Sequence, residues 1–86
     1  MLMVLEPPFK SRLQDLPEED QKAVYEAVTN PRGRKQRLKK VVSRRLRRQT
    51  WSIRIQNHRY RAFAEKVGCM YRWYWLGTHE QANNLL

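Results

Sequence analysis

Three short segments of alternating apolar and polar residues constrain the fold of this chain more than any other feature. They lie within WSIRIQNHRYRAFAEKVGCMYRWYWLGTHE, residues 51–80, and are rich in aromatic and β-branched side chains. Asn57-His58 and Gly68 supply the turns between them. Connections this short join antiparallel strands. The expected strands span roughly residues 50–56, 59–66 and 69–76.

The first two of these strands carry cations on the face that does not build the core. Alternation puts Trp51, Ile53 and Ile55 on one face, and Ser52, Arg54 and Gln56 on the other. Arg61 follows on the second strand, opposite Arg54 and on the same face as Phe63. Two interpretations of Arg61 are open: it contacts a phosphate, or it covers the Phe63 ring or pairs with Glu65. His79, just after the third strand, is either a functional group or a capping or surface residue.

The N-terminal part predicts one more strand and two helices. Met1–Leu5 is an apolar strand that ends before Pro7-Pro8, and Phe9–Leu16 has helical spacing. A second helix begins at Pro17 and ends at Asn30-Pro31. Its apolar stripe consists of Ala23, Val24, Ala27 and Val28.

At the other end of the chain, Gly77 is expected to end the third strand and Thr78 to cap a short helix, with Glu80 and Gln81 just inside it. We therefore expect one α+β domain, residues 1–86. In it, two N-terminal helices pack on one face of a four-stranded, mainly antiparallel, twisted sheet, and a short C-terminal helix follows. Trp51, Tyr71, Trp73 and Trp75 are assigned mainly to the core, with base stacking as the alternative.

Positive charge is concentrated in the second part of the chain. The formal net charge is +10. Residues 1–30 carry three Lys/Arg against six Asp/Glu, a net charge of −3, and residues 31–86 carry fifteen against two, a net charge of +13. This asymmetry favours a polyanionic partner such as RNA, DNA or an acidic protein segment. The alternative is a basic domain with no such partner.

The densest run of charge, here named the basic segment, covers about residues 32–49. Residues 32–48 hold ten Lys/Arg in seventeen positions and no acidic residue. Like charges oppose a helix there, so we expect a loop with a partly ordered middle. The loop is either a mobile, solvated segment or a guide for nucleic-acid phosphates. The expected RNA contacts are Lys39, Lys40, Arg44, Arg45, Arg47 and Arg48.

The reactive side chains favour chemistry without a metal or cofactor. His58 and His79 have no ligand-spaced partner, and Cys69, the single cysteine, excludes an internal disulfide and suits a reducing cytoplasm. Met1–Leu5 is too short to cross a membrane. Arginine and histidine can together cleave RNA, because the substrate's own 2′-hydroxyl attacks the neighbouring phosphate. Arginine forks bind the phosphate oxygens, and histidine transfers protons near neutral pH.

Six short motifs occur in a fixed order along nearly the whole chain: EPPFKSRLQDLP, AVTNP, RLKKV, WSIRI, RYRAF and WYWLGTHEQ. In this order they resemble the RelE/ParE superfamily of toxins from toxin–antitoxin systems, and the last three are most similar to its RelE-type branch. The resemblance implies a four-stranded sheet backed by two N-terminal helices. It also implies a cytoplasmic toxin that a cognate antitoxin neutralises. RelE-type toxins enter the ribosomal A site and cut mRNA there.

The resemblance assigns roles to three residues. Arg61, the arginine of the YR pair, corresponds to a phosphate-binding catalytic residue. Arg54 corresponds to a basic position on the preceding strand, and His79 to a histidine after the last strand. The implied function is a ribosome-dependent, metal-independent mRNA endoribonuclease that inhibits translation, in which Arg54 positions the backbone and His79 is the general base or acid. The implied partners are the ribosome, mRNA and an acidic or amphipathic segment of the antitoxin.

The chain departs from the family pattern at three places. Ser52 stands where some members carry a lysine, and Ala82 stands where patterns ending GTH or GSH usually place a tyrosine. Ser43–Gln49 extends a loop that is expected to be more compact. Two other functions therefore stay open. One is a ParE-like inhibitor of DNA gyrase with no nuclease activity, and the other is a non-toxic RNA-binding protein that uses the basic segment.

Overall fold

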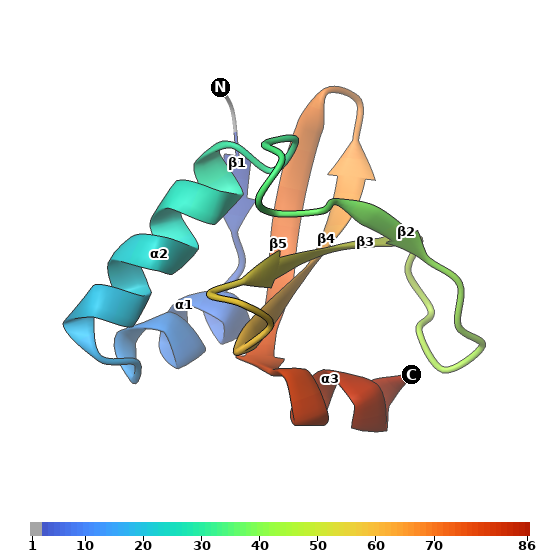
Figure 1. Cartoon of the computed structure of the whole chain (residues 1–86). Coiled ribbons are helices and arrows are strands. Elements are labelled where there is room, and N and C mark those ends of the chain that lie inside the picture. Colours follow the sequence, from blue (N-terminus) through green and yellow to red (C-terminus); the bar gives the residue numbers. More distant parts are fainter. Residues whose placement is uncertain (1–2) are drawn as a thin grey trace.

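The alternating C-terminal segments form the centre of a five-stranded sheet in the computed structural model, which describes residues 3–86 (Figure 1). The strands are β1 (Met3–Leu5), β2 (Lys39–Val41), β3 (Thr50–Ile55), β4 (Tyr60–Val67) and β5 (Met70–Thr78). Their order across the sheet is β1-β5-β4-β3-β2. β1 pairs parallel with β5, and the other neighbours are antiparallel. The α+β class and the three C-terminal strands are as expected.

The expectation of four strands is wrong, because the basic segment contributes β2 at the sheet edge. Lys39 and Val41 pair with Ser52 and Thr50 of β3, and Leu38 and Val41 are half-buried. Dense like charge disfavours a helix but is common on an edge strand, where the side chains reach solvent. Only Met3–Leu5 of the expected first strand is described, and residues 1 and 2 lie outside the described part of the chain.

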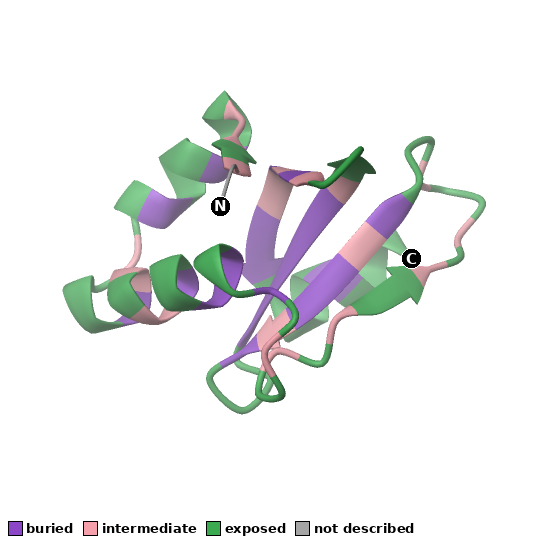
Figure 2. Ribbon diagram, turned by 90° about the horizontal axis from the view of Figure 1, so that it is seen from above, coloured by how far each residue is buried: buried purple, intermediate pink, exposed green. Residues whose placement is uncertain are grey.

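Two helices cover one face of the sheet, α1 (Pro7–Gln14) and α2 (Glu18–Thr29) (Figures 1 and 2). α1 begins two residues earlier than expected, because prolines fit the first turn of a helix, where the backbone N–H groups have no partner. The acidic first turn of α2 complements its helix dipole. The buried side chains between helices and sheet include Phe9, Leu13, Val24, Val28, Ile53, Ala62, Trp73 and Leu76.

The third helix, α3 (His79–Leu85), packs against β4 and β5 and is separate from the layer formed by α1 and α2 (Figure 1). The Thr78 hydroxyl accepts from the Gln81 backbone, and the Gln81 side chain accepts from the Thr78 backbone, so the expected cap is confirmed. Gly77 does not end the third strand, which continues to Thr78. A Cβ at Gly77 would lie 2.6 Å from the Trp75 ring and 2.7 Å from the Gln81 amide oxygen, so glycine is required here for packing.

A second, smaller apolar cluster lies on the sheet face opposite α1 and α2. Phe63 is fully buried there, and its ring stacks on Trp75 with centroids 4.8 Å apart. The register between β4 and β5 shifts at Phe63 and Ala64, which leaves Tyr74 without a partner in the ladder. The Tyr74 hydroxyl shares a hydrogen bond with Thr50. This cluster forms the apolar floor beside the cations described below.

Candidate nucleic-acid interface

Arg54 and Arg61 project from neighbouring strands on the sheet face opposite α1 and α2. They are direct partners in the β3–β4 register, while Ile53, Ile55 and Ala62 alternate with them and point into the core. The sequence prediction of this pairing is confirmed. The next residue across the sheet is Gly77, and the Trp75 ring and the Gln81 side chain occupy the space that a side chain at position 77 would take. The two guanidinium groups share one end of this sheet face, and Trp75 lies next to them.

Arg61 is a buried cation that forms no ion pair with any carboxylate of residues 3–86. Its side chain is 9% exposed, Nη2 donates to the Ser52 hydroxyl at 2.8 Å, and the guanidinium carbon lies 5.6 Å from the centre of the Phe63 ring. Nε is buried and has no hydrogen-bond partner. Within residues 3–86, the ion pairs involve other residues, so the proposed pairing of Arg61 with Glu65 is wrong. Burial and then the charge of Arg54 lower the pKa of Arg61. An uncompensated buried charge is costly, and an external anion would relieve that cost.

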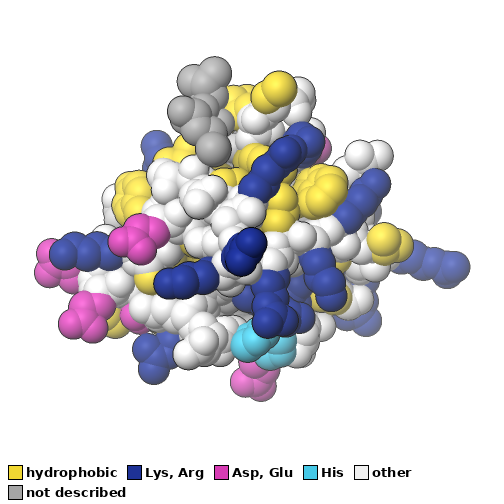
Figure 3. Space-filling view, turned by 45° about the horizontal axis from the view of Figure 1, so that its top comes forward, with side chains coloured by type: hydrophobic (Ala, Val, Ile, Leu, Met, Phe, Trp, Pro, Cys, Tyr) yellow, Lys and Arg dark blue, Asp and Glu magenta, His cyan; other side chains and the backbone are white. Residues whose placement is uncertain are grey.

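His79 lies at the same end of the sheet, as the first residue of α3. It is exposed, and its backbone N–H donates to the Arg59 carbonyl at 3.3 Å, which fixes α3 against the β3–β4 turn. A second histidine, His58, faces it from that turn. The two imidazole centres are 6.3 Å apart, with ring planes inclined at 78°. Figure 3 shows histidine side chains next to a group of lysines and arginines.

The sequence predicts His58 only as a turn residue, and its position beside His79 appears only in the structure. The signal was available in the strand register, because Tyr60 pairs with Thr78 and the residues just outside this pair must come close together. Partial desolvation and then the charge of Arg54 lower the pKa of His58 below its ordinary value of 6.5. Both effects favour its neutral form.

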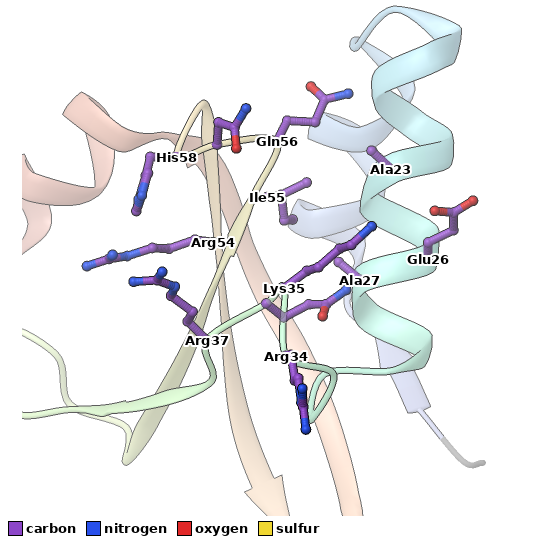
Figure 4. Close-up of a pocket in the computed structure, with 12 residues that line it drawn as sticks. Ala23, Glu26, Ala27, Arg34, Lys35, Arg37, Arg54, Ile55, Gln56 and His58 are labelled. Carbon is purple, nitrogen blue, oxygen red and sulfur yellow. The ribbon is translucent and has the colours of Figure 1, made fainter.

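A cleft of about 570 Å³ runs from α2 to this group of cations (Figure 4). Arg37, Arg54 and His58 extend toward the same side of β3, away from α2. The Arg54 backbone N–H donates to the Gln36 carbonyl at 2.9 Å, which holds the loop that carries Arg37 beside β3. Arg37 was not among the expected site residues. The cleft therefore gathers cations from two separate stretches of the chain.

The two lysines predicted to bind RNA point to opposite faces of the sheet. Lys39 pairs with Ser52 and shares the face of Arg54 and Arg61, whereas Lys40 pairs with Trp51 and lies on the helix side. Both lysines are exposed. Lys39 extends the cationic face toward the sheet edge, and Lys40 does not. The cationic face is here defined as Arg37, Lys39, Arg54, Arg61, His58 and His79.

The four arginines predicted to bind RNA after β2 have different surroundings. Arg48 donates to both carboxylate oxygens of Glu6 at 3.1 and 3.2 Å and lies 4.6 Å over the Tyr74 ring, and the bond to Glu6 raises its pKa. Arg45 donates to the Asn84 carbonyl at 3.2 Å. Arg44 and Arg47 are exposed and form no side-chain hydrogen bond or ion pair within residues 3–86. Of these four arginines, only Arg44 and Arg47 have a side chain without a hydrogen bond or ion pair within residues 3–86.

This part of the basic segment is also tied to the C-terminus. The Ser43 hydroxyl donates to the Leu86 carbonyl at 3.3 Å, next to the bond from Arg45 to Asn84. This part of the expected loop is thus anchored to the end of α3, which disfavours the alternative of a mobile, solvated segment. Within the same helix, Ala82 is completely buried. A tyrosine at this position has no room to reach the cationic face unless α3 moves.

The described residues offer two further observations. No group of three or more His, Cys, Asp and Glu side chains within residues 3–86 could hold a metal ion. Between Met3 and Leu86, the structure contains no helix with the length and apolar character needed to cross a membrane.

Comparisons of the chain with protein-family models, with curated proteins and with solved structures find no match. The family resemblance therefore depends on the motifs in the sequence alone.

Proposed function

We propose that this protein is a RelE-type toxin that cleaves mRNA on the ribosome without a metal ion. The observation that carries the proposal is Arg61, a buried guanidinium with a free Nε, no carboxylate partner and Arg54 directly opposite. Holding two cations together without a counter-ion costs stability, and a phosphate group between them offsets that cost. His79 stands at the same end of the sheet, where it can move a proton.

In the proposed reaction, the RNA 2′-hydroxyl attacks the adjacent phosphorus. Arg61 stabilises the negative charge that builds up on the phosphate oxygens, and its contacts with Ser52 and Phe63 keep it in position. Arg54 is more exposed and holds the RNA backbone against β3. His79 supplies one of the proton transfers. Except for Arg61, the cationic face lies at or near the surface, so alignment of the RNA depends on the ribosome.

The surrounding charge supports both proposed partners. Residues 31–86 carry a net charge of +13, which favours ribosomal RNA and mRNA over neutral surfaces. The same charge suits an acidic or amphipathic antitoxin segment that folds as it binds and covers the cationic face. Both partners act in the cytoplasm in this proposal.

The deciding experiment follows single-turnover cleavage of mRNA on programmed ribosomes with purified protein. We expect discrete cuts in the A-site codon that need the ribosome, persist in EDTA-treated protein and disappear with Arg61→Ala. Lys10→Ala is the matched control, because this exposed cation lies on α1, outside the cationic face. Intact mRNA together with blocked gyrase supercoiling would replace the nuclease proposal by gyrase inhibition.

A second experiment tests the toxin role in cells. Induced expression without a partner is expected to arrest growth, and primer extension on cellular mRNA is expected to show in-frame cuts. Co-expression of the neighbouring reading frame is expected to relieve the arrest. Normal growth at a high level of folded protein contradicts the toxin proposal.

A further inference from the structure

We infer that His58 and His79 form a two-imidazole acid–base site, in which His58 takes the proton from the RNA 2′-hydroxyl and His79 gives one to the leaving 5′-oxygen. This inference rests on the proposed function and adds to it a residue and a division of roles. The two imidazoles lie beside Arg54 and Arg61 at one end of the sheet. At this end, β3 and β4 are joined by the turn that carries His58, and β5 leads into α3.

The spacing of the two rings suits a phosphodiester between them. Their centres are 6.3 Å apart and their planes are inclined at 78°, so the rings do not stack. In an in-line displacement, the attacking and leaving oxygens lie on opposite sides of the phosphorus. The base and the acid must therefore stand apart, each within hydrogen-bond reach of its own oxygen. His58 lies on the turn between β3 and β4 and His79 begins α3, so the two rings are carried by separate elements.

The turn that carries His58 is unfavourable for its residues, which points to a role beyond chain reversal. Gln56, Asn57 and His58 have φ values of 52°, 52° and 72°, three consecutive left-handed residues without a glycine. Glycine or asparagine adopts this conformation at lower cost than histidine. Strained backbone of this kind gathers at functional sites. The imidazole at position 58 is thus held toward His79 by a turn that does not itself require a histidine.

The position and surroundings of His58 support the base role. Its ring lies on the same side of β3 as Arg37 and Arg54. Partial desolvation, followed by the charges of Arg54, Arg37, His79 and Arg61, lowers the pKa of His58, which favours the neutral form that accepts a proton. The inference gives the other proton transfer to His79.

The proton and bond changes balance within this site. His58 removes the 2′-hydroxyl proton as the 2′-oxygen forms its bond to phosphorus. The bond from phosphorus to the 5′-oxygen breaks, and that oxygen takes the proton of His79. The products are a 2′,3′-cyclic phosphate and a 5′-hydroxyl. Proton exchange with water then returns both histidines to their starting states.

The first test compares the pH dependence of single-turnover cleavage on programmed ribosomes for the wild-type chain and His58→Asn. Asparagine keeps the left-handed conformation and removes the imidazole. We expect a loss of about 10²–10⁴-fold in rate, disappearance of the acid limb of the pH–rate profile, and unchanged ribosome binding. Asn57→Gly is the matched control for the turn and is expected to keep the wild-type rate.

The second test separates the base from the acid. An mRNA in which sulfur replaces the bridging 5′-oxygen at the cut site has a thiolate leaving group that needs no proton. On this substrate we expect His79→Asn to recover to near the wild-type rate and His58→Asn to remain slow. Recovery of both variants, or of His58→Asn alone, overturns the assignment of roles.

The outcomes distinguish the inference from the proposed function. If the wild-type chain cuts mRNA and His58→Asn cuts at the same rate with the same acid limb, the two-imidazole site is wrong while the nuclease stands. If the wild-type chain cuts neither substrate on ribosomes, both are overturned. A 3′-phosphate that forms with no cyclic precursor also contradicts the two-imidazole reaction.

Discussion

Arg54 and Arg61 lie directly opposite each other in the β3–β4 ladder, so two like charges face one another on one side of the sheet. Like charges in this position destabilise a sheet, whereas a favourable cross-strand pair stabilises it by about 0.2–1 kcal/mol. Arg61 is also buried and has no carboxylate partner within residues 3–86. The arrangement therefore weakens the folded state of the free protein and strengthens its attraction for an anion.

Neutralising Arg54 is expected to increase stability while it reduces binding. Arg54→Gln removes the repulsion, so we expect the free energy of unfolding to rise by up to about 1 kcal/mol at low salt, measured by urea denaturation. The gain is expected to shrink at high salt, where charges are screened. Ribosome binding is expected to weaken in the same variant.

Lys10→Gln is the control for Arg54→Gln, because it removes an exposed charge on α1, far from any facing cation on β3 or β4. Its stability is expected to stay within about 0.5 kcal/mol of the wild type. A loss of stability in Arg54→Gln at every salt concentration contradicts the repulsion argument and assigns Arg54 a packing role.

The arginines of the basic segment that form no side-chain hydrogen bond are expected to affect RNA binding, whereas the hydrogen-bonded Arg48 is expected to affect stability. Neutralising Arg44 and Arg47 together removes at most two phosphate contacts, which lowers the slope of log affinity against log salt by up to about 1.4 for single-stranded RNA. Folding stability is expected to stay unchanged. Fluorescence anisotropy of a labelled RNA over a salt series measures the slope.

Arg48→Gln is expected to show the opposite result. It removes the bonds to Glu6 and the contact with the Tyr74 ring, so the free energy of unfolding falls by about 1 kcal/mol with little change in the salt slope. The opposite result would be a lower salt slope in Arg48→Gln and an unchanged slope when Arg44 and Arg47 are neutralised. It would show that Arg48 contacts RNA and that Arg44 and Arg47 do not.

A tyrosine at position 82, as in the family that the sequence resembles, is expected to damage the protein. Ala82 is the buried residue of α3 and is completely buried, so Ala82→Tyr overpacks the contact with the sheet and costs about 1–3 kcal/mol. Cleavage on ribosomes is not expected to improve. Ala82→Gly is the control for overpacking, because it changes the same buried position without adding side-chain volume. A tyrosine variant that is as stable as the wild type and cuts faster shows instead that α3 can turn toward the substrate.

The hydrogen bond from Tyr60 to Asp20 is expected to control stability in acid. The Tyr60 hydroxyl donates at 2.6 Å to the buried carboxylate, and this bond, more than the neighbouring Gln56 and Arg59, lowers the pKa of Asp20. Because the folded-state pKa lies below the unfolded one, the ionised carboxylate stabilises the fold above the unfolded pKa of about 3.9. That contribution is lost as the pH falls through the folded-state pKa.

Tyr60→Phe is accordingly expected to lower the unfolding temperature at pH 7, and the difference from the wild type is expected to narrow below about pH 4. Thermal unfolding followed by circular dichroism between pH 2 and 7 measures both. In an Asp20→Asn background, the same Tyr60→Phe change is expected to have no pH-dependent effect. A constant difference at every pH contradicts the coupling of Tyr60 to the Asp20 charge.

Local patterns were enough to predict much of this molecule. Alternation over residues 51–76 identified three strands, and the proline and acidic positions located two helices. The pairing of Arg54 with Arg61 followed from the short turn between their strands. The cap formed by Thr78 and Gln81 also followed from residue type and spacing. Each of these features depends on residues close together in the chain.

The tertiary structure decided the features that depend on distant residues. β2 forms because β3 offers it a free edge, whereas charge alone indicated a loop. Arg48 is held by Glu6, 42 residues away, so it lies apart from the cationic face. The burial of Ala82 follows from the packing of α3, and the approach of His58 to His79 follows from the β4–β5 register. The sequence by itself determined which residues could carry the chemistry, because residue type and alternation are local. Long-range pairing decided which of those residues meet.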